Sequence, residues 1–365
     1  MKVIIAGGGT GGHLFPGIAI AEEFQKREQK NIILFIGTDR GLDKKILGEK
    51  GFPLRILDVE GIKGKGPIER GEALLKIPGS LLRSFRIIRE FRPDIVIGVG
   101  GYASGPAVIM AHFMGIKTTV AEQNALPGIT NRLLGRFVDK VFLTFSETKE
   151  WFPARKVLIT GNPIRAEFSP AITAREKGSG TGRASGNFTI LISGGSQGAH
   201  AINMAFINAV GHLKEMGEQL RIIHQTGYRD MEEVSKIYQT HGIEAEVLPF
   251  ISDMASAFRK ADLLICRAGA TTVAEITVSG KASVLVPFPF AANDHQTKNA
   301  EILVKAGAAE MIPERELEGR RLAETVRRLY HHPDMIREME AKSTGLGNIR
   351  AAADIVDACT ALVKG

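Results

Sequence analysis

The feature that most constrains this chain is a glycine-rich loop directly behind an apolar run at its start. Residues 2–6 (KVIIA) predict a buried parallel strand, and residues 7–13 (GGGTGGH) follow at once. Residues 14–24 then have the apolar spacing of a helix. Backbone N–H groups at such a helix start can hold an anion, usually a phosphate. The opening therefore predicts a phosphate-binding loop, with a tight turn that binds nothing as the simpler alternative.

The same glycines fit the dinucleotide fingerprint G-x-G-x-x-G, which raises the possibility of a nicotinamide cofactor. Such a site needs an acidic residue after the second strand to hold the ribose hydroxyls. The second expected strand, residues 32–36, ends in Gly37-Thr38, and Asp39 comes late and is followed by Arg40-Gly41. The second strand therefore argues against a nicotinamide oxidoreductase.

Length and composition set broad limits. The 365 residues, 44% of them hydrophobic, suffice for two domains with separate cores and are typical of a soluble globular protein. Cys266 and Cys359 are too few for a disulfide framework and fit a reducing cytosol. The first apolar run is too short for a signal peptide. Residues 95–116 carry no charge but are broken by glycines and Pro106, so we expect a strand, a loop and a helix there instead of a membrane span.

The net charge of +7 favours an anionic partner, and much of the excess lies between Lys63 and Arg92. No basic motif interleaved with aromatic residues supports nucleic acid as that partner. A membrane surface fits better.

Within this basic segment, residues 81–91 predict a helix that begins behind Pro78-Gly79-Ser80 and packs one apolar stripe on its domain. Leu82 falls outside the stripe, close to Arg83, Arg86 and Arg89. A leucine ringed by arginines suits an anionic bilayer surface, and a solvated helix face is the alternative.

Apolar runs alternate with amphipathic stretches in both halves, which predicts doubly wound parallel sheets covered on both faces. Gly161-Asn162-Pro163 and the low-complexity residues 178–186 separate the halves, and the strand, glycine loop and helix of the opening recur from residue 188. We expect domains at 1–163 and 164–346, with a last helix within 347–365 that returns to the first. The expected strands are 3–6, 32–36, 54–59, 95–99, 118–121, 141–145 and 157–160, then 188–192, 221–224, 246–248, 263–266 and 283–286.

Residues 266–275 (CRAGATTVAE) are the most informative segment. An expected strand ends at Arg267, Gly269 turns the chain, and a helix starts near Ala270. The N–H groups of Ala270, Thr271 and Thr272, with two hydroxyls, can hold a pyrophosphate at the positive helix end. Glu275 lies on the same helix face and can accept both hydroxyls of a ribose, although a glutamate near a helix start is also common without a ligand. Val273 and Ala274 complete the expected site.

Six motifs in this order resemble the MurG family of glycosyltransferases (glycosyltransferase family 28). They are residues 9–13 (GTGGH), 122–124 (EQN), 161–163 (GNP), 194–199 (GGSQGA), 266–275, and Gln296 with Asn299-Ala300. The resemblance implies the GT-B fold, with two Rossmann-like domains facing across a cleft. It also implies inverting transfer of N-acetylglucosamine from UDP-N-acetylglucosamine to the muramoyl 4-hydroxyl of undecaprenyl-diphosphate-linked lipid I, giving lipid II for peptidoglycan at the cytoplasmic face of the bacterial plasma membrane.

The resemblance also assigns further residues of the binding site. Arg267 and the backbone of Phe250 and Ile251 bracket the uracil, and Gln296 reads the sugar hydroxyls. The cleft beside Thr10, Gly11 and Gly12 is lined by Asn124, Arg165 and Ser196. No metal and no obligatory cofactor are expected, because the chain has no D-x-D motif and its histidines lack ligand spacing.

Some positions depart from the family pattern. Ala121 stands where relatives often carry histidine, His200 where arginine is common, and Ala268 where serine is common. No catalytic role therefore transfers to residue 121. A related lipid glycosyltransferase with another acceptor and a non-catalytic sugar-nucleotide-binding subunit remain alternatives.

His13 is the candidate general base, because a neutral imidazole can take the proton of the attacking 4-hydroxyl. Its place at a helix start disfavours the imidazolium form. Glu122 and Asp39 are the competing bases. A ring that only caps the loop or touches an acceptor phosphate is the structural alternative.

Overall fold

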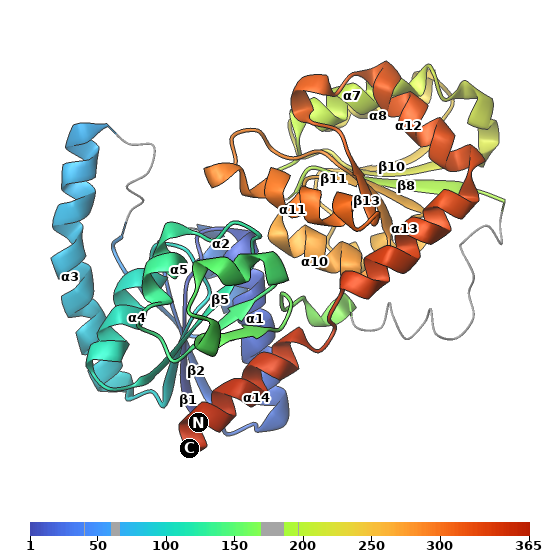
Figure 1. Ribbon diagram of the computed structural model, residues 1–365. Coiled ribbons are helices and arrows are strands. Elements are labelled where there is room, and N and C mark those ends of the chain that lie inside the picture. Colours follow the sequence, from blue (N-terminus) through green and yellow to red (C-terminus); the bar gives the residue numbers. More distant parts are fainter. Residues whose placement is uncertain (40, 60–65, 169–185, 196) are drawn as a thin grey trace. The chain divides into compact units, whose positions relative to one another are not determined.

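In the computed structural model the chain is described at residues 1–39, 41–59, 66–168, 186–195 and 197–365, with backbone alone at 41–42 and 67–75 (Figure 1). Ser196 and nearly all of the 178–186 segment lie outside this description. The chain divides into two compact units. Unit 1 comprises Met1–Arg165 and Asn348–Gly365, and unit 2 comprises Ala166–Gly347.

Unit 1 is built on a parallel sheet in the order β3-β2-β1-β4-β5-β6-β7. Alternate strand residues face opposite sides, and both sides are buried, which explains why the strands read as continuous apolar runs. Helices α1, α2 and α14 pack on one face, and α3, α4 and α5 on the other. The strands are β1 Lys2–Ala6, β2 Ile32–Gly37, β3 Leu54–Ile56, β4 Ile95–Gly98, β5 Lys117–Glu122, β6 Lys140–Leu143 and β7 Val157–Ile159; the helices are α1 Gly11–Arg27, α2 Gly41–Glu49, α3 Pro67–Phe91, α4 Ser104–Phe113, α5 Ile129–Leu134 and α14 Ala351–Lys364.

Unit 2 repeats this plan with a parallel sheet in the order β10-β9-β8-β11-β12-β13. In both units the first strand lies at the point where the strand order reverses. The strands are β8 Phe188–Ser193, β9 Leu220–Gln225, β10 Glu244–Leu248, β11 Leu263–Cys266, β12 Ala282–Leu285 and β13 Ala309–Met311; the helices are α7 His200–Val210, α8 Met231–Thr240, α9 Met254–Lys260, α10 Ala270–Ser279, α11 His295–Lys305, α12 Gly319–His331 and α13 Pro333–Leu346. The predicted fold class of two doubly wound parallel α/β sheets is confirmed.

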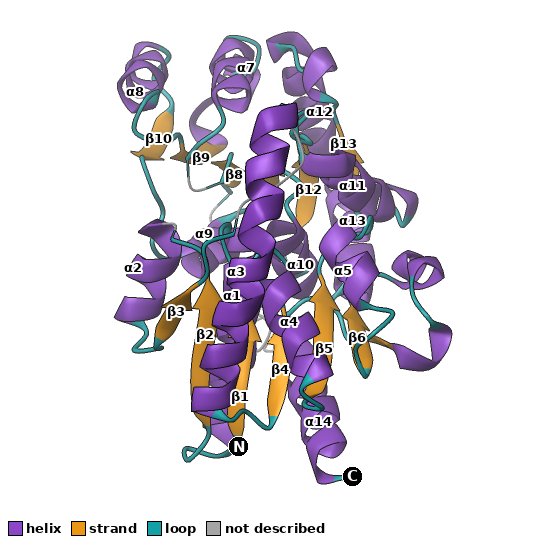
Figure 2. Cartoon of the chain, turned by 90° about the vertical axis from the view of Figure 1, so that its left-hand side faces the viewer, coloured by secondary structure: helices purple, strands orange, loops and turns teal. Residues whose placement is uncertain are grey.

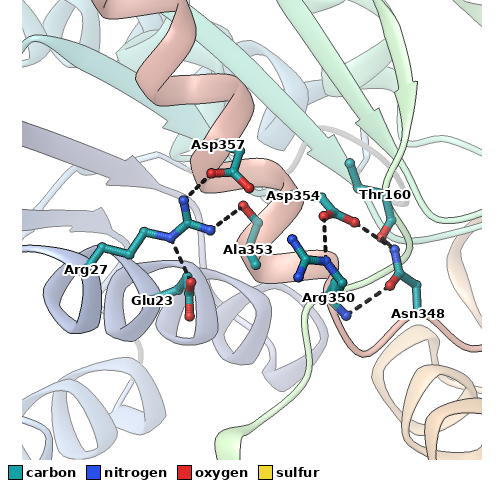
Figure 3. Close-up of polar contacts among 8 residues, drawn as sticks. All are labelled: Glu23, Arg27, Thr160, Asn348, Arg350, Ala353, Asp354 and Asp357. Atoms are coloured by element: carbon teal, nitrogen blue, oxygen red, sulfur yellow. Dashed lines mark hydrogen bonds and ion pairs between the residues drawn. The ribbon is translucent and has the colours of Figure 1, made fainter.

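The last helix, α14, packs against α1 in unit 1 (Figure 1). Figure 3 shows the polar contacts at this seam: Arg27 on α1 bonds Glu23 at 2.8 Å and also pairs with Asp357. Where the chain re-enters the unit, the Asn348 amide donates to the Thr160 carbonyl at 2.9 Å. Three apolar side chains of α14 enter the core beneath α1, namely Ile355, Val356 and Cys359. Helix α14 thus completes the core of unit 1 to which β1 and α1 also contribute.

One local prediction was wrong, and one strand was missed. Helix α3 does not begin after Pro78 but runs through it, from Pro67 to Phe91. The proline removes one backbone hydrogen bond, and burial of Ile87 and Ile88 holds the later turns on the sheet. Figures 1 and 2 show the first turns of α3 extending beyond the strands of unit 1. Strand β13 was not predicted, because a three-residue strand with a central glutamate has no clear apolar pattern.

Candidate functional site

Two glycine loops meet at the strand-order reversal of unit 1. Gly7, Gly8 and Gly9 after β1 have φ of 154°, 123° and 87°, and Gly100 and Gly101 after β4 have φ of 92° and 81°. A Cβ on Gly7 would lie 2.5 Å from the Gly100 oxygen, and one on Gly101 would lie 2.6 Å from the Gly8 oxygen. Only glycine fits this close contact. The second loop was not recognised as part of the site from the sequence, although its paired glycines were the available signal.

A buried carboxylate holds the first loop. Asp43 on α2 is 1% exposed, and its Oδ2 accepts the Gly9 N–H at 2.7 Å. Part of the expected phosphate cradle therefore already holds an anion that belongs to the protein. Contrary to the expectation for the whole loop, a fixed negative charge beside Gly8 and Gly9 disfavours a phosphate at that stretch, which leaves the helix start at Thr10, Gly11 and Gly12. Sequence reasoning considered the exposed Asp39 and missed Asp43.

His13 lies in the first turn of α1, with its half-buried ring against the second glycine loop. A Cβ on Gly100 would lie 2.6 Å from the His13 Nδ1, so the ring packs on bare backbone. The same Nδ1 is 3.3 Å from the Oε1 of Gln123, at the end of β5. The loop, the helix and the neighbouring strand together fix this imidazole at the carboxyl edge of the sheet, where such sheets bind their ligands.

Glu122 has a different environment. It is 3% exposed, and burial raises the pKa of its carboxyl group. Its Oε1 accepts from the backbone and side-chain nitrogens of Asn124 at 3.0 and 3.3 Å, and its Oε2 accepts from Gly128 N and Asn131 Nδ2 at 3.0 Å each. These four bonds use all the lone pairs of a carboxylate. Glu122 therefore anchors the loop before α5 and has no lone pair left to accept a proton from a substrate, contrary to its expected role as an alternative base.

The other residues expected in unit 1 lie around these groups. Thr10 is exposed and caps α1 with its backbone in an extended conformation. Asn124 is half-buried and held by Glu122. The Arg165 guanidinium lies 5.2 Å from the ring centroid of Phe15, in the same turn of α1 as His13. Ser196 lies outside the described residues.

In unit 2 the helix after β11 begins as predicted. Gly269 precedes α10 with φ −64° and ψ 146°, and Ala270, Thr271 and Thr272 form the first turn. Glu275 follows in the next turn and is 4% exposed. The arrangement places polar backbone and hydroxyl groups at the positive helix end, with a carboxylate one turn behind them.

Val273 and Ala274 require a correction. Both side chains are buried in unit 2, and the Val273 N–H already donates to the Gly269 carbonyl at 2.9 Å. Helix formation uses these backbone groups internally, so the two residues support the turn without offering a contact to a ligand.

Arg267 and Ile251, the residues expected at the uracil, make hydrogen bonds to other segments of unit 2. Arg267 donates to the carbonyls of Val286 and Pro287 at 3.1 and 3.2 Å and pairs with Glu314 at 2.5 Å. The Ile251 N–H donates to the Gln225 Oε1 at 2.8 Å, which leaves the Ile251 carbonyl as its available backbone group. Gln225 was missed because nothing around it in the sequence marks a site.

Gln296 lies at the start of α11, behind a strained turn. Asn293 and Asp294 have φ of 57° and 56°, a left-handed conformation that is uncommon outside glycine. The Gln296 Oε1 accepts the Phe288 N–H at 3.0 Å, which ties the helix start to the loop after β12. Asn299, one turn later, is buried and donates to the Ala268 carbonyl at 3.1 Å.

Neither cysteine is a reactive thiol, because burial raises the pKa of Cys266 and of Cys359 to about 12. Among the described residues, no group of three or more histidine, cysteine or acidic side chains is arranged to hold a metal ion. None of the helices in the described ranges has the length and apolar character needed to cross a membrane.

Paired Rossmann-like sheets with glycine loops at their reversal points define a nucleotide-dependent enzyme of the GT-B class. The chain belongs to glycosyltransferase family 28: the profile of the N-terminal domain of that family matches residues 3–143, and the profile of its C-terminal domain matches residues 189–358.

The relatives show which members of this family the chain resembles. The chain is 58% identical to the UDP-N-acetylglucosamine–N-acetylmuramyl-(pentapeptide) pyrophosphoryl-undecaprenol N-acetylglucosamine transferase of Syntrophus aciditrophicus, over 100% of this chain and 99% of that protein. It is 48% identical to the protein of the same name from Myxococcus xanthus, over 100% of this chain and 93% of that protein. The crystal structure of MurG from Acinetobacter baumannii superposes with a TM-score of 0.80 at 32% identity, covering 98% and 99% of the two chains. The resemblance inferred from the sequence motifs is confirmed.

Proposed function

We propose that this protein transfers N-acetylglucosamine from UDP-N-acetylglucosamine to the muramoyl 4-hydroxyl of undecaprenyl-diphosphate-linked lipid I, giving lipid II. The observation that carries this proposal is the 58% identity, over the whole chain, to a transferase named for that reaction. The site supports it with a base candidate in unit 1 and a diphosphate-compatible helix start in unit 2.

Unit 2 binds the donor in this proposal. The first turn of α10 receives the diphosphate, and the helix dipole stabilises the charge that develops on UDP as it leaves. Glu275 accepts the ribose hydroxyls, and Gln296 contacts the sugar. Arg267 and the Ile251 carbonyl bind the uracil. The ion pair with Glu314 fixes Arg267, and the hydrogen bond to Gln225 fixes the backbone at Ile251. No obligatory metal is needed to neutralise the leaving group.

Unit 1 binds the acceptor in this proposal. His13 takes the proton of the 4-hydroxyl while that oxygen bonds to the anomeric carbon and the bond from this carbon to the UDP oxygen breaks. One displacement of this kind inverts the anomeric configuration. Thr10, Gly11 and Gly12 lie at the start of the helix that carries His13, and Asn124 and Arg165 contact the acceptor from their places beside α1 and β5.

The direct test supplies radiolabelled UDP-N-acetylglucosamine to the purified protein with lipid I in detergent. We expect a labelled lipid product that migrates as lipid II, and none when the muramoyl 4-hydroxyl is methylated. Undecaprenyl-diphosphate carrying a different sugar tests the related lipid glycosyltransferases. Transfer to that acceptor but not to lipid I would contradict the assignment.

We further propose that unit 1 binds the cytoplasmic face of the bacterial plasma membrane as a peripheral protein. Leu82 on α3 is 51% exposed, and the exposed side chains of Arg83, Arg86 and Arg89 lie on the same helix. A shallow hollow there is lined by Leu82, Phe85, Arg86, Arg89, Glu90 and Arg92. An apolar side chain among arginines matches an anionic lipid surface.

Sedimentation with vesicles tests this surface. Binding to phosphatidylglycerol vesicles is expected to fall as salt rises. Replacement of the three arginines by serine is expected to weaken it by ~1 kcal/mol per residue. The matched control removes the same charge from unit 2 by substituting Arg315, Arg320 and Arg337, which are also exposed. Equal losses in both variants would show that net charge alone drives binding.

A further inference from the structure

Gln123 is a buried amide between a backbone carbonyl and the ring of His13. It is 1% exposed, and its Nε2 donates to the Ala121 carbonyl at 3.2 Å. Its Oε1 lies 3.3 Å from the His13 Nδ1. The two residues are far apart in sequence and meet because β5 and the start of α1 reach the same edge of the sheet.

The contact with Ala121 fixes which way the amide points. A carbonyl oxygen only accepts hydrogen bonds, so the NH₂ end of Gln123 must face it. The opposite orientation would set two oxygens against each other in a place from which water is excluded. The Gln123 oxygen therefore faces the imidazole, and it too only accepts.

This orientation determines the tautomer of His13. A neutral imidazole carries its proton on one nitrogen, and the hydrogen bond made by one nitrogen decides the role of the other. Because the Gln123 oxygen accepts, Nδ1 carries the proton, and the lone pair is on Nε2. A proton arriving from an attacking hydroxyl then has one defined destination.

We infer that Gln123 is a positioning residue that holds His13 as the Nδ1–H tautomer, with Nε2 as the atom that accepts the acceptor's proton. This inference rests on the proposed function for its consequence in catalysis. The tautomer itself is a property of the protein without substrates and can be measured separately.

Charged groups also lie on the elements around the His13 ring. Asp43 lies on α2 against Gly8 and Gly9, and Glu122 precedes Gln123 on β5 with its four hydrogen bonds. Arg165 lies over the ring of Phe15, which follows His13 by two residues in α1. Gln123 itself is neutral, so it orients the ring without adding charge, whereas a glutamate would also stabilise the imidazolium form.

The first experiment reads the tautomer by NMR. Protein labelled with ¹⁵N-histidine is recorded at pH 8, and His13 is assigned from the spectrum of His13→Gln. We expect the Nδ1–H form in the unmodified protein and a mixture of both forms in Gln123→Met, which keeps the length of the side chain but has no acceptor oxygen. The Nε2–H form in the unmodified protein, or the same Nδ1–H form in Gln123→Met, would overturn the inference.

The second experiment reads the pH dependence of transfer. Gln123→Met is expected to lose tenfold or more in turnover with UDP affinity unchanged. Gln123→Glu is expected to restore most of that turnover at high pH. The pH below which turnover falls, the acidic limb of the pH–rate profile, is expected to rise by about one pH unit. Asn131→Leu is the control, because Asn131 also donates to the Ala121 carbonyl, at 3.1 Å, and its other hydrogen bond is to Glu122. It is expected to reduce stability and leave the acidic limb in place.

The two failures are distinguishable. If the unmodified protein does not use lipid I, the proposed function fails and the NMR result still decides the tautomer. If the protein transfers the sugar but Gln123→Glu behaves like Gln123→Met and neither moves the acidic limb, Gln123 has a structural role only and the inference fails.

Discussion

The glycine loops after β1 and after β8 occupy equivalent places in two sheets of the same order, yet different groups hold them. In unit 1 the carboxylate of Asp43 accepts the Gly9 N–H at 2.7 Å. In unit 2 the amide of Gln225 donates to the Gly195 carbonyl at 2.7 Å and accepts the Ile251 N–H. One loop is braced by a charge and the other by a neutral side chain.

This difference shows that a glycine pattern predicts a turn and not its ligand. A fixed negative charge at the first loop opposes a phosphate at Gly8 and Gly9. In unit 2 a neutral amide braces the loop after β8, and the helix start expected to hold a diphosphate is a separate turn, behind Gly269. Four experiments test this contrast, and the largest expected effect comes first.

In the proposed mechanism the base, His13, lies in unit 1, so His13→Ala is expected to remove transfer and spare donor binding. Loss of a general base costs ~100- to 10,000-fold in turnover. UDP affinity by calorimetry is expected to stay within about twofold, and the acidic limb of the pH profile is expected to disappear. A variant that retains more than about a tenth of the turnover would exclude His13 as the base.

In the proposed mechanism the donor binds to unit 2, so Glu275→Ala is expected to weaken UDP binding by ~1.5–3 kcal/mol, the value of a hydrogen bond to a charged group. 2′-Deoxy-UDP lacks one of the hydroxyls that Glu275 accepts. It is therefore expected to bind the variant and the unmodified protein with similar affinity. Unchanged affinity for UDP itself would move the ribose site away from α10.

The two units are also expected to respond differently to acid. His224 on β9 is enclosed by Tyr238 and Asn203, and burial lowers its pKa to about 3. The unfolded chain binds the proton near pH 6.5 and the folded unit does not, so stability is complete above that pH and falls below it. Between pH 6.5 and 5 the loss is ~2 kcal/mol. Hydrogen exchange of β9 peptides is expected to accelerate over this range more than that of β1 peptides, and an equal response would contradict the assignment to unit 2.

The smallest effect is expected when the carboxylate at the loop after β1 is replaced by a neutral amide, like the one at the loop after β8. Asp43→Asn keeps an acceptor for the Gly9 N–H but removes the charge, which is expected to cost ~1 kcal/mol of stability. Asp39→Asn, at an exposed aspartate near the same loop, is the control and is expected to change stability by less than about 0.5 kcal/mol. Urea denaturation followed by the fluorescence of Trp151, which lies in unit 1, measures both.

The sequence predicted those parts of the fold and site that depend on neighbouring residues. The buried strands are continuous apolar runs, and the turn into α10 follows from Gly269 and the threonines behind it. Glu275 could be placed because helical spacing relates it to Thr271 and Thr272. These relations extend over a few residues, so a single segment of sequence contains them.

The bracing groups could not be predicted, because they come from elsewhere in the chain. Asp43 reaches Gly9 from α2, and Gln225 reaches Ile251 from another strand. For Glu122 the residue type indicated a base, whereas burial and four donors made it an anchor. Only the packed structure shows which polar groups are already satisfied.

The return of the chain at Asn348 has a consequence for how the protein is made. Unit 2 is one continuous segment, so it can fold as soon as its last residue leaves the ribosome. Unit 1 begins first but lacks Ile355, Val356 and Cys359 until α14 has been synthesised. The half of the protein that carries His13 is thus completed last. A product that stalls before α14 is therefore expected to contain a folded unit 2 and a unit 1 whose core is open.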